Sequence, residues 1–267
     1  ALARAARIVT ADYSFPILAH APLEPVACVA RVTETRCEIW TGDANITSLQ
    51  VKASETLGLR SDQIEVHSVF AGGHFGRRGE TALEAVEIAK AIKGRAPVKL
   101  QWTREEEIQN SVYMPMYLHR ATAGLDEYGN LIAYSHRIVG KSLLLDSPEY
   151  AERYVIDGVD FTSVVGLAST SYDIENILVE SHNAQVAMPT ATWRSNYNKT
   201  YAIETFLDQV ALAAGRDPYE FRRSLLGRDP RLKQIDALAV PEAIKPRMFA
   251  EYPRELRVLE LAAERAG

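Results

Sequence analysis

Residues 64–84 read IEVHSVFAGGHFGRRGETALE and carry the clearest structural signal in the chain. The β-rich run 64–70 predicts a strand, and the glycine-rich run 71–79 predicts a loop. Thr81-Ala-Leu-Glu84 has the spacing of a capping box, which predicts the start of a helix. The expected arrangement is therefore a strand, a glycine loop and a helix N-terminus.

The glycine loop is a candidate anion site. Glycines allow the backbone to approach a ligand closely, and the first N–H groups of a helix are free to bind an anion. The candidate ligand-binding residues are Gly72, Gly73, Phe75, Gly76 and Arg77. The loop lacks both the Gly-Lys-Ser/Thr of a Walker A loop and the Gly-x-Gly-x-x-Gly of a dinucleotide fingerprint. These residues alone leave an anion-binding loop and a plain tight turn open as alternatives.

A second candidate lies in the run 186–195, which leads towards a long apolar helix. It contains Trp193 followed by Arg194, and an arginine in such a loop can bind a phosphate or carboxylate through two hydrogen bonds. The alternative is that Trp193 packs in the core and that Arg194 has a structural role.

Short strands, hairpins and helices alternate unevenly along the rest of the chain, which favours an α+β fold of mixed sheets with hairpins and packed helices. The expected strands are 27–32, 37–40, 97–102, 117–125, 131–139 and 175–186. The expected helices are 46–57, 202–214, 218–225 and 255–266, and 229–253 is expected to be extended.

Composition excludes several functions. The chain has 267 residues, is 47 % hydrophobic and has a formal net charge of -5, so it has no basic surplus for nucleic acid. No apolar run reaches the length of a transmembrane helix, roughly 20 residues. The six histidines and two cysteines lack the spacing of a zinc site, so no metal ligand is expected. In a hairpin turning near residues 34–35, Val32 rather than Cys28 faces Cys37, which argues against a disulfide.

Three runs, 70–78, 83–91 and 97–105, together resemble the molybdopterin-binding large subunit of the xanthine dehydrogenase and aldehyde oxidase family. The resemblance is closer to its isoquinoline 1-oxidoreductase and membrane-associated aldehyde dehydrogenase branch, where the loop commonly ends in Gly-Arg-Arg. Further matching runs follow the family's order, and they are His20-Ala-Pro-Leu-Glu-Pro25, 124–129, Pro189-Thr-Ala-Thr-Trp-Arg194 and 203–211.

The resemblance implies a domain that binds molybdopterin with molybdenum, as such or in a dinucleotide form. It also implies an enzyme that oxidises an aldehyde or an N-heterocycle with oxygen from water and passes electrons to [2Fe-2S] clusters on a partner chain. Gly73, Phe75 and Gly76 would lie over the metal, Arg77 would hold the pterin or its pyrophosphate, and Arg194 would belong to a second loop near the metal. The expected partners are the remainder of the large subunit, an iron-sulfur small subunit and a small-molecule substrate. A periplasmic and a cytoplasmic bacterial location both stay open.

The sequence departs from the family pattern at three points. His74 stands where the family usually has a small residue, and a glutamine usual shortly after the position of Trp40 is missing. The family's catalytic glutamate lies in a Gly-x-Gly-Glu motif that does not occur here, so no catalytic residue is assigned. We therefore expect the chain to be inactive by itself.

The expected organisation is a first cofactor-binding subdomain over 1–140, with the glycine loop, and part of a second over 141–267, with the Trp-Arg loop and the C-terminal helices. Two rival interpretations stay open. One is a degenerate scaffold or binding module of the same fold, with its site closed by His74. The other is an unrelated enzyme that binds a nucleotide phosphate at 72–76.

Overall fold

The computed structural model describes residues 1–75, 80–145, 151–152, 154–191, 197–226 and 252–267. The chain divides into two units, each with its own core. The first unit contains 1–16, 115–187 and 195–267, and the second contains 17–114 and 188–194. The expected division into 1–140 and 141–267, which was drawn from the cofactor loops, stays a prediction, and residue 140 lies inside the first unit.

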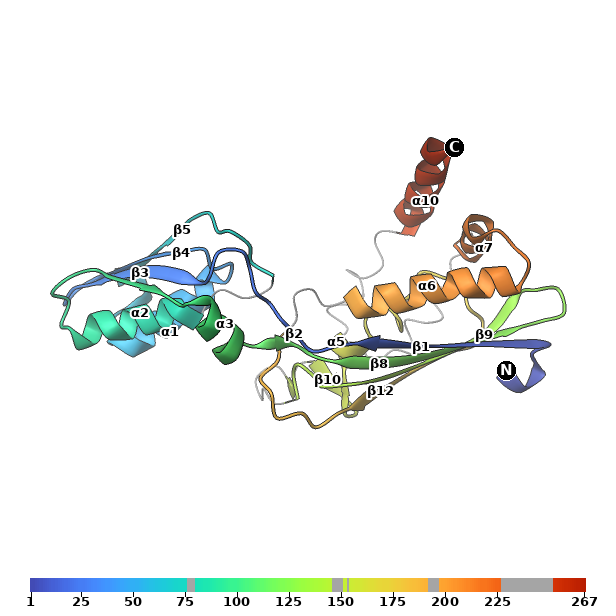
Figure 1. The fold of residues 1–267 in the computed structure, drawn as a ribbon, viewed down its shortest axis with the longest axis horizontal. Coiled ribbons are helices and arrows are strands. Elements are labelled where there is room, and N and C mark those ends of the chain that lie inside the picture. Colours follow the sequence, from blue (N-terminus) through green and yellow to red (C-terminus); the bar gives the residue numbers. More distant parts are fainter. Residues whose placement is uncertain (76–79, 146–150, 153, 192–196, 227–251) are drawn as a thin grey trace. The chain divides into compact units, whose positions relative to one another are not determined.

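The second unit is built on a four-stranded sheet of order β5-β4-β3-β6. β3 (Ala27–Val32) pairs antiparallel with both β4 (Cys37–Thr41) and β6 (Val98–Gln101), and β4 pairs parallel with β5 (Ile64–Ser68). Two helices, α1 (Ile46–Leu57) and α2 (Glu80–Ala91), lie along this sheet (Figure 1). They supply buried residues to the same core as the strands. The 3-10 helix η2 is Ser61–Gln63, the helix α3 is Arg104–Asn110, and the short strands β2 and β7 are Leu18–Ala19 and Tyr113–Met114.

Alternation of side chains explains why one face of this sheet is buried. Cys37, Ile39 and Thr41 of β4 are buried, whereas Glu38 and Trp40 between them are partly exposed. This is the period of two that a strand covered on one face requires. The core beneath it is apolar, and it contains Cys28, Ala30, Val32, Cys37, Ile39, Leu49, Ala53, Ile64, Ala82, Ala85, Val86 and Ala89.

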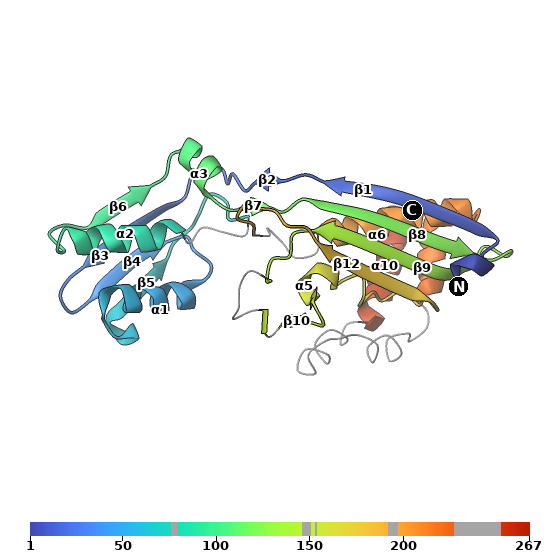
Figure 2. The ribbon, with the colours of Figure 1, turned by 90° about the horizontal axis from the view of Figure 1, so that it is seen from below.

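The first unit is built on a longer sheet of order β1-β8-β9-β12 (Figure 2). β1 (Arg7–Phe15) and β9 (Leu131–Gly140) flank β8 (Tyr117–Leu125) antiparallel, and β12 (Ile177–Asn183) pairs parallel with β9. Helix α6 (Tyr197–Ala213) packs on β1 and β8, and α7 (Pro218–Leu225) packs against α6. They contribute Phe206, Leu207, Val210 and Phe221 to the core of this unit. The remaining elements are η1 (Leu2–Arg4), β10 (Val155–Ile156), β11 (Val159–Asp160), α5 (Phe161–Val164) and α10 (Tyr252–Ala266).

The α+β fold and both predicted hairpins are confirmed. Helix α1 ends at Gly58, which adopts the left-handed conformation with φ +70°, and α7 begins with the Asp217 carboxylate accepting a bond from the N–H of Glu220. Val32 faces Cys37 as expected, and both cysteines are free thiols. Within the described ranges, no helix combines the length and apolar character needed to cross a bilayer.

Two expectations are corrected. The capping box at Thr81 and Glu84 is wrong, because α2 already includes Glu80 and the Glu84 carboxylate instead accepts a 2.8 Å bond from the indole N–H of Trp102. Strand β1 was not expected, because its pairing partner β8 lies about a hundred residues further along the chain. The extended run 229–253 lies almost wholly outside the described residues.

Candidate functional site

The glycine loop leaves the sheet of the second unit at the end of β5. The N–H of Val69 still bonds to the carbonyl of Thr41, at 3.0 Å, and keeps the chain beside β4 for one residue beyond the strand. Phe70, the next residue, has a fully exposed ring. The described part of the loop, up to residue 75, therefore begins at the edge of the sheet and carries an uncovered aromatic side chain.

Gly72 is fixed to Glu24 by two hydrogen bonds. The N–H of Gly72 donates to Oε2 of Glu24 at 2.6 Å, and the N–H of Glu24 donates to the carbonyl of Gly72 at 3.0 Å. A Cβ atom on Gly72 would lie 2.6 Å from Cβ of Glu24, closer than two carbon atoms can pack. This contact joins two runs that the sequence resemblance singled out separately, 20–25 and 70–78.

Gly73 and Phe75 both adopt left-handed backbone conformations. Gly73 has φ +112°, and a Cβ there would lie 3.1 Å from Cβ of Pro22. Phe75 has φ +43°, which is rare for a residue with a side chain, and its ring is half exposed. His74, between them, is half-buried. The backbone conformation and the contact with Pro22 therefore both favour glycine at position 73.

The segment that supports Gly72 and Gly73 is itself held in place. The guanidinium of Arg104 donates to the carbonyls of Pro22 and Leu23, with a distance of 3.0 Å to Leu23, and pairs with the carboxylate of Glu107, which is only 4 % exposed. The buried ring of His20 lies 2.8 Å from the carbonyl of Val112 through Nδ1. α3 and the residues after it therefore position the turn under the glycine loop.

The stem of the second predicted loop lies in the same small arrangement of strands. The backbone N–H of Tyr113 donates to the carbonyl of Pro189 at 3.0 Å, and the backbone N–H of Ala191 donates to the carbonyl of Tyr113 at 2.9 Å. β7, which contains Tyr113, pairs antiparallel with β2, and β2 leads directly into His20. The stem 189–191 and the support of the glycine loop are thus connected through β7 and β2 within the second unit.

The predicted site residues fall into two groups. Gly72, Gly73 and Phe75 lie together in the described loop. Gly76, Arg77, Trp193 and Arg194 lie outside the described residues. The sequence interpretation gave no role to Arg104, although it quoted the run that contains it. A basic side chain next to three acidic residues resembles an ordinary exposed helix start, and its contact with Pro22 spans 82 residues.

The first unit contains a buried polar chain that the sequence did not single out. Nδ1 of His119 lies 2.8 Å from Nε2 of His136, and Nδ1 of His136 lies 2.6 Å from the hydroxyl of Tyr134. At the other end, Nδ2 of Asn198 lies 3.3 Å from Nε2 of His119. We call Tyr134, His136, His119 and Asn198 the histidine chain. It joins strands β8 and β9 to the first turn of α6.

The direction of the bonds in the histidine chain follows from Asn198. Its Oδ1 accepts from the N–H of Lys199 at 2.9 Å, so its amide N–H donates to Nε2 of His119. His119 then donates through Nδ1 to His136. Burial lowers the pKa of His119 to about 3, with a smaller effect from His136, and burial lowers the pKa of His136 to about 4. Both rings are therefore neutral at pH 7.

A buried lysine stands beside the histidine chain. Lys199 is 2 % exposed and its ammonium donates to the carbonyl of Thr162. Burial lowers its pKa to about 8, partly offset by the Asp160 carboxylate. Asp160 also accepts from the hydroxyl of Ser142 at 2.6 Å. These contacts fix the start of α6.

The family model described as the molybdopterin cofactor-binding domain matches residues 1–226. The chain belongs to this family.

The relatives agree with that assignment. One of the subunits of nicotinate dehydrogenase from Pseudomonas putida is 27 % identical over 242 residues, which cover 86 % of this chain and 20 % of the relative. The beta chain of isoquinoline 1-oxidoreductase from Brevundimonas diminuta is 26 % identical over 232 residues, 84 % of this chain and 29 % of the relative. The chain therefore spans between a fifth and a third of the length of these two relatives.

A solved structure shows the same fold. Quinoline 2-oxidoreductase from Pseudomonas putida 86 superposes with a TM-score of 0.67 at 19 % identity, over 83 % of this chain and 28 % of that chain. Similarity at this level of identity supports the fold, and the chemistry has to be argued from the residues of the site.

Proposed function

We propose that this chain forms part of the molybdenum-cofactor site of a hydroxylase that oxidises an aldehyde or an N-heterocycle with oxygen derived from water. The rest of the large subunit and a partner carrying [2Fe-2S] clusters would complete the enzyme. The observation that carries the proposal is the support of the glycine loop, in which Glu24 fixes Gly72 and Pro22 packs against Gly73. The membership of the family supports the class of cofactor.

The described loop fits a cofactor that lies close against the backbone. Gly73 lacks a side chain at a position whose φ of +112° few other residues adopt, and the half-exposed ring of Phe75 stands beside it. The hydroxyl of Thr81, in the first turn of α2, is buried and has no hydrogen-bond partner in the described part of the chain. A helix start that follows a glycine loop in the sequence is an environment in which an anionic group gains backbone hydrogen bonds.

The residues have different roles in this proposal. Gly73, Phe75 and Gly76 would lie over the metal, Arg77 would bind the pterin or the pyrophosphate of a dinucleotide form, and Trp193 and Arg194 would line the second loop. Gly72 would position this loop through Glu24. When bound, the cofactor supplies the two-electron oxidation and the site at which water-derived oxygen is transferred. The chain's own part is to bind and orient it.

The proposal is tested by Gly73→Val in the enzyme assembled with its native partners. We expect the variant to lose most of its molybdenum and pterin, because the added side chain meets Pro22 and does not tolerate the backbone conformation. Gly58→Val is the matched control, because Gly58 also has a positive φ of +70° but has open space around its Cβ position. Equal cofactor content in the two variants, with both folded by circular dichroism, would contradict the proposal.

A further inference from the structure

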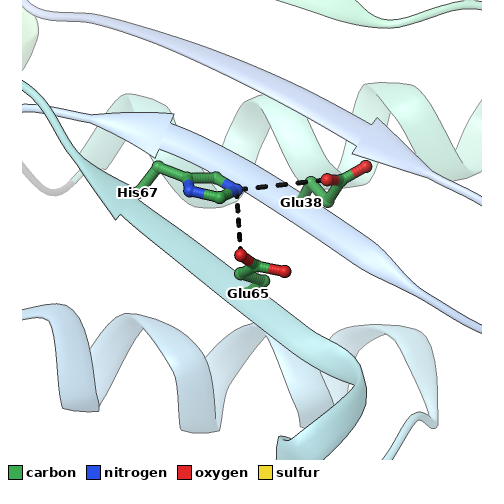
Figure 3. Close-up of side chains that lie close together, drawn as sticks. All are labelled: Glu38, Glu65 and His67. Carbon is green, nitrogen blue, oxygen red and sulfur yellow. Dashed lines mark ion pairs between the residues drawn. The ribbon is translucent and has the colours of Figure 1, made fainter.

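Three side chains with metal-binding atoms lie together on the outer face of the sheet in the second unit. They are Glu38 from β4 and Glu65 and His67 from β5, and we call them the His67 cluster (Figure 3). In the parallel pairing of these strands, Glu38 lies beside Glu65 and Trp40 lies beside His67. Residues two apart on a strand point to the same face, so the register itself brings the three together.

The candidate ligand atoms of the His67 cluster all lie within 4.8 Å of one another. Nε2 of His67 lies 3.5 Å from Oε1 of Glu65 and 4.0 Å from Oε1 of Glu38. In a tetrahedral zinc site with bonds of roughly 2.0–2.1 Å, the ligand atoms are about 3.3–3.4 Å apart. Small rotations of two partly exposed glutamate side chains would bring all three atoms onto one ion.

Each carboxylate is also held by an arginine through its other oxygen. Oε2 of Glu65 pairs with the guanidinium of Arg36, and Oε2 of Glu38 lies 3.9 Å from Nη1 of Arg31. Oε1 of both glutamates therefore remains directed towards His67. Partners of this kind orient metal ligands in proteins. Nη2 of Arg36 also lies 3.8 Å from Oε1 of Glu38. Ligation of an ion by this oxygen would require the Glu38 carboxylate to turn away from Arg36.

The imidazole is oriented for ligation. The ring of His67 stacks on Trp40 with the ring centres 4.9 Å apart and the planes 14° from parallel. Its Nε2 is buried and makes no hydrogen bond to any residue that the structure describes, although the side chain as a whole is 33 % exposed. The nitrogen thus faces the two carboxylates at distances too long for strong hydrogen bonds.

We propose that the His67 cluster binds Zn²⁺, with Nε2 of His67, Oε1 of Glu65 and Oε1 of Glu38 as ligands and water in the remaining position. One imidazole and two carboxylates form a ligand set that zinc accepts, whereas Mg²⁺ and Ca²⁺ prefer oxygen ligands alone. The bound ion would link β4 to β5, the strand from which the glycine loop departs. This site uses none of the residues proposed to bind the molybdenum cofactor.

The spacing of histidines and cysteines could not predict this site. Glu38 is 27 residues from Glu65 in the sequence, and only the parallel pairing of β4 with β5 brings them together. The sequence expectation that no metal ligand is present rested on local spacing alone.

Zinc titration of the full chain by isothermal calorimetry tests the proposal. We expect a stoichiometric site that is weakened at least about tenfold in His67→Gln and in Glu65→Gln, because each variant removes one of three protein ligands. The matched control is His182→Gln in the first unit. Nε2 of His182 lies 3.9 Å from Oε1 of Glu180, but among the described residues His182 belongs to no group of three potential metal ligands. This control should bind zinc as the unmodified chain does. Equal zinc affinity in His67→Gln and His182→Gln would overturn the proposal.

A second readout uses Trp40. Cu²⁺, which accepts the same ligands, should quench the fluorescence of Trp40 because this indole stacks on the liganding imidazole. The quenching should disappear in Trp40→Phe and in His67→Gln, although Trp102 and Trp193 remain in both. Quenching that persists in both variants would place the bound ion elsewhere in the chain.

Discussion

The two units have a similar architecture but differ in the side chains that they bury. Each covers one face of a four-stranded sheet with helices. The second unit buries single polar side chains beside an apolar core, among them Thr41, Thr81 and Glu107, whereas the first unit buries the histidine chain between its sheet and α6, with Lys199 beside it. An apolar core stabilises a fold but tolerates small shifts of its helices and strands. A fully hydrogen-bonded polar chain fixes the positions of the elements that it joins. In the second unit, specific polar contacts instead lie at the support of the glycine loop.

The stability of the two units should respond to different changes. The stability of the first unit should depend on protonation and on each member of the histidine chain. The sensitive point of the second unit should be the contact of Arg104 with the segment that supports Gly72 and Gly73.

The largest expected effect is the loss of stability of the first unit in acid. The pKa values of His119 and His136 are about 3 and about 4 in the folded chain, against an ordinary value of 6.5. Below pH 6.5 the unfolded chain therefore binds protons that the folded chain excludes. The free energy of unfolding should fall by about 1.4 kcal/mol per pH unit for each histidine, between about pH 6.5 and pH 4.

Hydrogen exchange measured by mass spectrometry at several pH values separates the two units. The exchange rates are first corrected for the intrinsic pH dependence of exchange. Peptides from β8 and β9 should then lose protection as the pH falls through this range, before peptides from β3 and β4 do. Loss of protection in both units together, with the same pH dependence, would contradict the assignment to the histidine chain.

His119→Leu should destabilise the first unit by about 3 kcal/mol, because it leaves the amide of Asn198 and Nε2 of His136 buried without partners. Urea denaturation followed by tyrosine near-ultraviolet circular dichroism measures this change. His182→Leu, at an exposed position on β12, serves as the control and should unfold at nearly the same urea concentration as the unmodified chain. A His119→Leu variant as stable as this control would show that the histidine chain does not stabilise the first unit.

Arg104→Met should destabilise the second unit by about 2 kcal/mol, because the carbonyls of Pro22 and Leu23 lose a donor and the buried Glu107 carboxylate loses its ion pair. The fluorescence of Trp40 and Trp102 during denaturation reports on this unit. Arg60→Met is the matched control, since Arg60 pairs with Asp62 at the surface. If the two variants unfold alike, Arg104 does not support the loop.

The smallest effect is expected for Asp12→Asn. The Arg120 guanidinium lowers the pKa of Asp12, but both side chains are more than half exposed. Solvent screens such pairs, so the thermal midpoint of the first unit should not change measurably. A clear drop in the midpoint would mean that polar contacts on the open face of the sheet also stabilise this unit.

Local signals explain which parts of the fold were predictable. The 27–41 hairpin, α1 and α7 were predicted because their turns, caps and periodic apolar residues lie within about fifteen residues of one another. β1 was missed because its alternating pattern becomes meaningful only when it pairs with β8. The capping box was wrong because the indole N–H of Trp102, the residue after β6, donates to the Glu84 carboxylate.

The candidate site was predictable by residue type but not by contact. The glycine loop and the run 20–25 were both recognised from their residues, yet nothing local indicates that Glu24 bonds to Gly72 across 48 residues. The histidine chain likewise joins residues 119, 136 and 198, whose proximity depends on how α6 packs on β8 and β9. Long-range contacts of this kind follow from the tertiary fold.

The central claim is that the glycine loop belongs to a working molybdenum-cofactor site, and the most direct test is the metal and pterin content of the chain purified from its native host with its associated chains. We predict one molybdenum and one pterin for each copy of the chain, together with an iron-sulfur partner. A pure native assembly without molybdenum or pterin would contradict the claim, and it would favour a scaffold of the same fold whose site is closed by His74.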